Sequence, residues 1–170
     1  FLFFFFFGSR LVSGNAENVL LSGYANYHWQ QSGDRVLYIS LDASVGANLD
    51  LDNQVLLGGD SGLRGYPIRY QTGDSKALLT IEQRFFTDWF PFRLFHVGAA
   101  AFFDAGRTWG DSPVSGVNLG LLRNVGVGLR LGNARASGFG RMLHIDLAYP
   151  LDGGSDIRGT QLLIEAKRSF

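Results

Sequence analysis

Apolar and polar residues alternate with a period of two along most of this chain, a pattern typical of β-strands with one apolar and one polar face. Within residues 37–48, for example, apolar residues hold the odd positions and mostly polar residues the even ones. The same alternation predicts further strands at Leu2–Val12, 21–29, 77–86, 94–104, 123–131, 141–149 and 161–167. The period nowhere becomes helical, so we predict an all-β fold of about eight strands.

Such alternation fits either a soluble β-sandwich or a transmembrane antiparallel β-barrel, because both need one apolar face per strand. The predicted strands are near ten residues long, the length that crosses a bilayer at a tilt. Aromatic residues also gather at the strand ends, as they do at membrane interfaces. These aromatic residues are Trp29, Trp89, Phe90, Phe92, Trp109 and Tyr149. We therefore favour the barrel. We expect residues 1–170 to form one β-barrel domain that is integral to a bacterial outer membrane.

The connections between the predicted strands differ in length. Shorter turns at 31–34, 87–92 and 133–140 alternate with connections at 49–75, 110–118 and 151–159, which are longer on average. Outer-membrane barrels place short turns in the periplasm and long loops outside. We therefore expect an extracellular loop at 49–75 and two periplasmic termini. The first strand is unusual, because Phe3–Phe7 places aromatic residues on both faces and predicts a dry inner face there.

Composition removes several classes of function. The chain has no cysteine, which excludes disulfides and thiolate metal sites, and its 15 basic residues balance 15 acidic ones. Without net charge or basic runs we expect no nucleic-acid partner. The longest apolar run, Phe1–Phe7, is far too short for a spanning helix. His96 and His144 lie on non-consecutive strands without ligand spacing to carboxylates, so we expect solvated histidines and no metal or other cofactor.

The long connection contains a motif, Leu63-Arg64-Gly65-Tyr66, which three further segments follow in order. These are Glu82-Gln83-Arg84, Phe102-Phe103-Asp104-Ala105-Gly106 and Asp146-Leu147-Ala148-Tyr149-Pro150-Leu151. The ordered set resembles the outer membrane protein 85 superfamily, the bacterial surface antigen family that includes the barrel-assembly insertase and two-partner secretion transporters. The resemblance covers about residues 36–170 and implies the C-terminal half of a sixteen-stranded barrel, without POTRA domains. Phe170 resembles the C-terminal signal recognised by the barrel-assembly machinery.

The resemblance also implies a role for the motif arginine. Arg64 would fold back into the barrel and pair with acidic residues on the next two strands, Glu82 and Asp104. Strand parity supports this independently, because both carboxylates fall on the polar register of adjacent strands and one guanidinium can bridge them. Small residues on the same inner register would let the loop backbone approach closely. These wall residues are Gly98, Ala100, Gly126 and Gly128.

Eight strands can close alone, but the interior of such a barrel is just wide enough for side chains, so the loop would have to stay outside. The alternatives are half of a wide barrel, completed by a second copy or a partner chain, and a fragment of a longer protein. The preserved pairing residues favour a wide barrel. The dry Phe1–Phe7 strand favours the small closed barrel, which is our expectation.

Three functions follow. The resemblance implies a barrel that helps proteins or lipids to insert into or cross the outer membrane, with outer-membrane lipids as partners and no enzymatic activity. The alternative is a structural or anchoring barrel. A third reading is a hydrolase, because Gly59-Asp60-Ser61-Gly62 resembles the nucleophile segment of chymotrypsin-like proteases and His28, His96 or His144 could act as base. The segment lacks the Gly-Pro that follows in those proteases, so we expect Asp60 and Ser61 to shape a turn.

Overall fold

The fold is one large antiparallel sheet of eight strands, with a second sheet of two short strands. The computed structural model describes residues 2–12, 15–91, 95–110, 120–133, 141–153, 157 and 159–168, with side chains from residue 18 onward except at 51, 133, 141 and 168. The strands of the large sheet are β1 (Leu2–Val12), β2 (Asn15–Ser32), β3 (Arg35–Ala47), β6 (Ser75–Phe86), β7 (Phe95–Trp109), β8 (Leu122–Asn133), β9 (Arg141–Pro150) and β10 (Gln161–Arg168). The predicted all-β fold and all eight predicted strands are confirmed.

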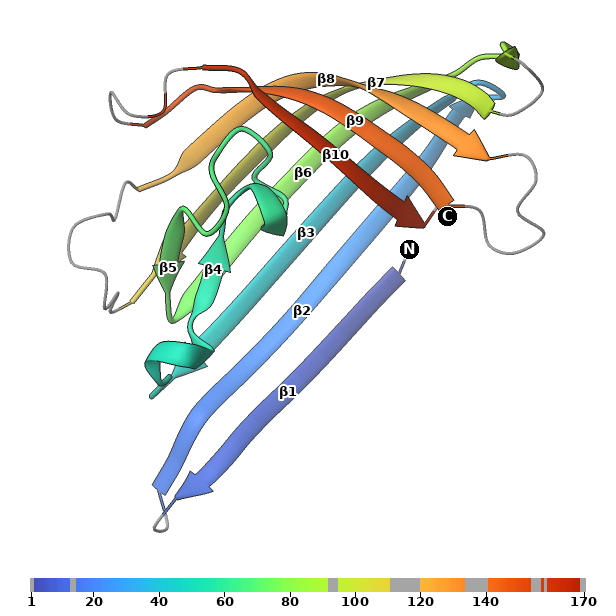
Figure 1. Cartoon of the computed structure of the whole chain (residues 1–170). Coiled ribbons are helices and arrows are strands. Elements are labelled where there is room, and N and C mark those ends of the chain that lie inside the picture. The colour runs from blue at the N-terminus through green and yellow to red at the C-terminus, as the bar shows by residue number, and fades with distance from the viewer. Residues whose placement is uncertain are drawn as a thin grey trace.

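Each strand of the large sheet pairs with its neighbour in this order, so the sheet is a simple meander (Figure 1). Several strands are longer than the ten residues that we predicted, reaching 18 residues in β2 and 15 in β7. β1 and β10 form the two edges, and each pairs with a single neighbour among the described residues. β1 begins and β10 ends at the end of the sheet that carries the β2–β3 turn (Figure 1).

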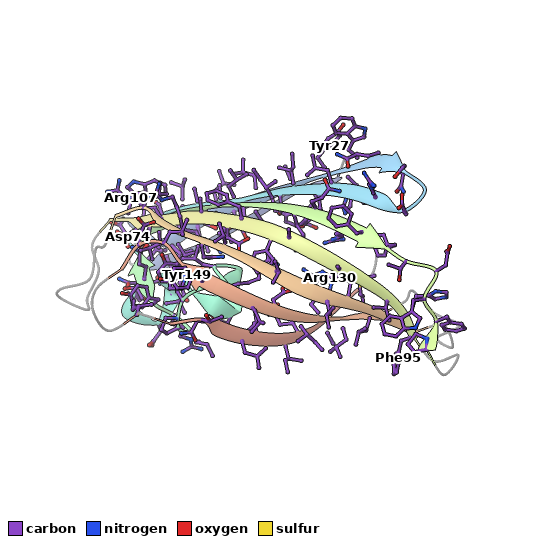
Figure 2. All side chains as sticks on the ribbon, turned by 90° about the horizontal axis from the view of Figure 1, so that it is seen from above. Tyr27, Asp74, Phe95, Arg107, Arg130 and Tyr149 are labelled. Carbon is purple, nitrogen blue, oxygen red and sulfur yellow. The ribbon has the colours of Figure 1, made fainter. Side chains whose placement is uncertain are left out.

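The two faces of the sheet have inverted polarity compared with a soluble protein. On the convex face, Val127 pairs with Leu147, and Leu147 pairs with Leu162. The side chain of Val127 is 59% exposed and that of Leu162 is 61% exposed. Tyr27 likewise projects away from the sheet in Figure 2. On the concave face, Asp104 is 0% exposed and Asp146 is 1% exposed. The sandwich alternative requires a second sheet packed on the apolar face. In the part of the chain described, no such sheet covers it.

The segment between β3 and β6 folds back into the concave side of the sheet (Figure 1). It contains two short 3₁₀ helices, η1 (Leu51–Asn53) and η2 (Gly59–Ser61), and the two paired strands β4 (Val55–Leu57) and β5 (Gln71–Gly73). We call residues 48–74 the inward loop. The expectation that this loop stays outside is therefore wrong, because the loop buries its own apolar and charged residues against the concave face.

The predicted aromatic inner face of Phe3–Phe7 falls on side chains outside the described ones. The backbone of these residues forms part of β1 and pairs with Leu21–Ala25 of β2. Phe170, the predicted assembly signal, also lies outside the described residues.

Candidate functional site

A tight turn brings the motif arginine to the tip of the inward loop. Gly59 donates its N–H to the Pro67 carbonyl at 3.1 Å, and Leu63 donates to the Gly58 carbonyl at 2.9 Å. The Ser61 hydroxyl accepts the Gly58 N–H at 2.7 Å and donates to the Gly58 carbonyl at 3.2 Å. Gly62 then takes a φ of 102°, which favours glycine. The prediction that Asp60 and Ser61 shape a turn is confirmed for Ser61, and Asp60 accepts the Arg69 N–H at 3.4 Å.

An apolar core fastens the inward loop to the sheet. Leu57 and Leu63 of the loop are completely buried against Leu78 of β6 and Leu122 of β8. Leu78 occupies the inward register, where the alternation otherwise places polar residues, because the loop removes this position from water. Burial of a leucine side chain contributes about 1.5–3 kcal/mol. The loop is thus a packed part of the structure.

Arg64 lies next to this core and is 4% exposed. Its Nε and Nη2 donate to the two carboxylate oxygens of Asp104, each at 2.9 Å. Its Nη1 donates to Glu82 at 2.8 Å and to Asp146 at 3.0 Å. We call these four residues the loop lock. Burial by itself would lower the pKa of the Arg64 guanidinium, but the hydrogen bonds and charges of Asp104 and Glu82 outweigh it and raise the pKa above its usual value.

Two further arginines from the wall complete the charge balance of the loop lock. Arg130 of β8, about midway along the sheet in Figure 2, donates to Glu82 at 3.0 Å and also pairs with Asp146. Arg84 donates its Nε to Glu82 at 2.8 Å. Three arginines therefore face three carboxylates, and Asn124 donates a further bond to Asp104 at 2.8 Å. Buried charges need this pairing because desolvation of an isolated ion is costly.

The ring of Phe102 packs against the guanidinium of Arg64. The Cζ of Arg64 lies 3.4 Å from the ring centroid of Phe102, a cation–π contact. Phe102 belongs to the inward register of β7, two residues before Asp104. Gly126 on the neighbouring strand faces this ring, since a Cβ at Gly126 would collide with the Phe102 Cζ and the Leu147 carbonyl.

The wall glycines are therefore small for a different reason from the predicted one. The nearest atoms to a Cβ at Gly128 would be those of the Asp146–Arg130 ion pair, and at Gly98 they would be the Phe85 carbonyl and the Phe86 ring. The loop backbone instead approaches the wall through its own glycine. A Cβ at Gly65 would lie 2.5 Å from the Asn124 Cβ. Ala100 is buried on the same inner register, but its atoms are not among those nearest to an added Cβ at Gly98, Gly126 or Gly128.

Tyr66 of the motif ties the inward loop to the β9–β10 connection. Its phenolic oxygen lies 2.8 Å from the carbonyl oxygens of Arg123 and Asp152, to which it donates, and accepts the Asp152 N–H at 3.3 Å. Arg123 and Asp152 also form a bidentate ion pair with bonds of 2.9 and 2.8 Å. Tyr66 thus holds two connections together at the end of the sheet where the loop enters.

Burial of the Tyr66 phenol makes the free energy of unfolding depend on pH in the alkaline range. Burial raises the pKa of the Tyr66 phenol, although its hydrogen bond to Asp152 partly opposes this. The stabilisation is complete below the unfolded pKa of about 10 and is lost as the pH rises through the higher folded pKa. We expect the free energy of unfolding to fall more steeply above pH 10 in the wild type than in Tyr66→Phe. Urea unfolding of both proteins from pH 8 to 11.5 measures this, and parallel curves would contradict it.

The structure brings together the residues predicted to pair, Arg64 with Glu82 and Asp104. It adds Asp146 and Arg130, which the sequence analysis did not assign to the pairing. A usable signal existed for both, because Asp146 and Arg130 occupy the same inward register as the predicted anchors. The prediction stopped at the two strands that follow the loop in sequence, whereas Asp146 lies 82 residues after Arg64.

Both hydrogen bonds of the Ser61 hydroxyl are with Gly58, so neither joins it to one of the three histidines proposed as a base. His28 contacts the Tyr38 ring and His96 stacks on Phe90 with a centroid distance of 4.4 Å. The expectation of a solvated His144 is wrong, because this side chain is 5% exposed.

The described residues include no group of three or more His, Cys, Asp or Glu residues placed to hold a metal ion. No helix within them is long and apolar enough to cross a membrane.

Comparison with known proteins adds no family. No protein-family model matches this chain, and no curated protein matches it. The similarity to the outer membrane protein 85 superfamily therefore stays a prediction drawn from the ordered motifs.

Proposed function

We propose that this chain forms part of the wall of a β-barrel in a bacterial outer membrane. The observation that carries the proposal is the inverted polarity of the sheet, with apolar side chains exposed on the convex face and paired charges buried on the concave one. A face such as that of Val127, Leu147 and Leu162 is stable in hydrocarbon, whereas its exposure to water would be costly. The buried loop lock would then lie in the barrel interior.

The two sheet edges support a wide barrel. Unpaired strand edges are not tolerated within the hydrocarbon region, so β1 and β10 need partners. An eight-stranded barrel has an interior that side chains alone fill, while this sheet holds a folded inward loop. We therefore propose that a second copy, a partner chain or further strands of a longer parent chain complete the barrel.

Native mass spectrometry of the complex extracted in mild detergent tests this closure. We expect a dimer, an additional chain or a longer parent chain, each of which denaturation would then weigh separately. A species containing a single 18.7 kDa chain would contradict the wide barrel.

Within such a barrel, we propose that the chain assists the insertion or transport of proteins or lipids. Support comes from an inward loop that fills the interior and is held at its tip by one arginine among three carboxylates. The resemblance of its motifs to assembly and transport barrels agrees with this role. The barrel-assembly machinery is the expected partner during biogenesis.

Cells that carry Arg64→Ala test the role. We expect reduced insertion or export of outer-membrane clients at an unchanged level of the chain itself. Arg69→Ala is the matched control, since Arg69 lies five residues away in the same loop and is exposed. If Arg64→Ala frees the loop but leaves every client unaffected, the alternative function is correct and the chain is a structural or anchoring barrel.

A further inference from the structure

A cavity of about 260 Å³ lies directly beside the loop lock. The tip of the inward loop covers one side, and the inner faces of β3, β6, β9 and β10 form the rest. Its lining includes the cationic side chains of Arg84 and Lys167 together with His144. Hydroxyl groups of Ser40 and Thr80, on adjacent positions of β3 and β6, face the same space. The cavity is therefore rich in hydrogen-bond donors.

Arg84 is held in place with part of its guanidinium unused. Its Nε is bound to Glu82 at 2.8 Å, and its Cζ lies 4.7 Å from the centre of the Tyr38 ring. The two terminal nitrogens of Arg84 make no hydrogen bond to any described residue. Guanidinium N–H groups fixed in this way form a fork that suits phosphate oxygens.

His144 lines the same cavity. The side chain is 5% exposed and lines the cavity, yet its Nδ1 has no hydrogen-bond partner among the described residues. Lys167 approaches from β10, where its Nζ lies 2.8 Å from Glu165.

The carboxylates near the cavity are each paired with a cation, and Glu165 is paired with Lys167. Glu82 contacts Arg64, Arg84 and Arg130, and these contacts use both of its oxygens. Asp42 lies 3.4 Å from the Nζ of Lys76. An incoming anion would therefore meet paired carboxylates and donor groups with spare capacity.

We propose that this cavity binds a phosphate group, carried either by a small soluble molecule or by a lipid headgroup. Arg84 and Lys167 provide charge-assisted hydrogen bonds, and the hydroxyls of Ser40 and Thr80 bind the remaining oxygens. The volume is below the usual range for drug-sized ligands and suits a small group. This site does not depend on the proposed function, because client assembly could fail while phosphate binding persists.

Isothermal titration calorimetry on the protein extracted in mild detergent, with any chain that accompanies it, tests the site. The probes are inorganic phosphate, glycerol 3-phosphate and dihexanoylphosphatidic acid below its micelle concentration. Saturable binding of the first two indicates a soluble ligand. Binding of the phosphatidic acid alone indicates a lipid headgroup.

Two variants and a control assign the site. Arg84→Gln and Lys167→Gln should each weaken binding about tenfold or more, because each removes hydrogen bonds from a charged donor. The ion pair of Lys167 is with Glu165, which does not belong to the loop lock, so its variant stays informative if Arg84→Gln disturbs folding. Arg35→Gln is the control, since Arg35 is exposed and lies against Phe85 on the outward register. Absence of saturable binding in the wild type, or wild-type affinity in both variants, would overturn the proposal.

Discussion

Replacing Arg64 by alanine is expected to release the inward loop while the eight-stranded sheet stays folded. The substitution removes four hydrogen bonds to three carboxylates. Glu82 and Asp146 keep Arg84 and Arg130 as partners, whereas Asp104 keeps only its hydrogen bond from Asn124. Loss of one member of a buried ion pair typically costs about 3–5 kcal/mol. The strand ladders do not include Arg64, so the cost falls mainly on the contact between loop and wall.

Trypsin cleavage after Arg69 measures this release, because Arg69 lies in the loop of both proteins. Cleavage that depends on loop opening follows the population of the open state. A cost of this size should raise the rate more than about a hundredfold. Arg35→Ala, an exposed substitution outside the loop, should cleave at the wild-type rate.

Asp104→Asn, combined with Arg64→Ala, tests how much of the cost comes from the carboxylate left without a cation and how much from lost packing. Asp104→Asn removes one carboxylate from the loop lock, so its addition to Arg64→Ala should cost less than the two single effects combined. Unchanged cleavage in Arg64→Ala would show that the apolar core around Leu63 holds the loop without the lock. Additive effects in the double variant would rule out coupling between the two residues.

Gly126→Ala is expected to cause the next largest loss of stability. The added Cβ would collide with the Phe102 ring and with the Leu147 backbone carbonyl, and the backbone atom cannot move without disturbing the β8–β9 ladder. Overpacking of this kind typically costs about 1–3 kcal/mol. Displacement of Phe102 should also weaken its contact with Arg64 and speed cleavage at Arg69.

Gly132→Ala is the matched control on the same strand and register. The nearest atoms to its added Cβ, in His96, would be 4.0 Å away, so the substitution should be neutral or slightly stabilising. Urea unfolding of both variants compares the free energies. Equal values for the two glycines would show that the wall around Phe102 adapts without strain.

Much of the candidate site was visible in the strand parity. Glu82 and Asp104 share the inward register of neighbouring strands, and the motif marked Arg64 as the residue that meets them. Phe102 and Asp146 lie on the same register, but parity alone does not say which inward residues converge on one guanidinium. The short strands β4 and β5 were not predicted, because three residues are too few for a period to be recognised.

The sequence by itself determined the strands and the side of the sheet on which each residue lies. This is a local property, since successive side chains of a strand point to opposite faces. Only the tertiary structure decided where the inward loop goes and which charges it meets. Both depend on the curvature of the sheet, which brings Asp146 of β9 and Glu82 of β6 to the same nitrogen of Arg64. The inward Leu78 shows the same limit, because its apolar side chain fits a polar register only when the loop covers it.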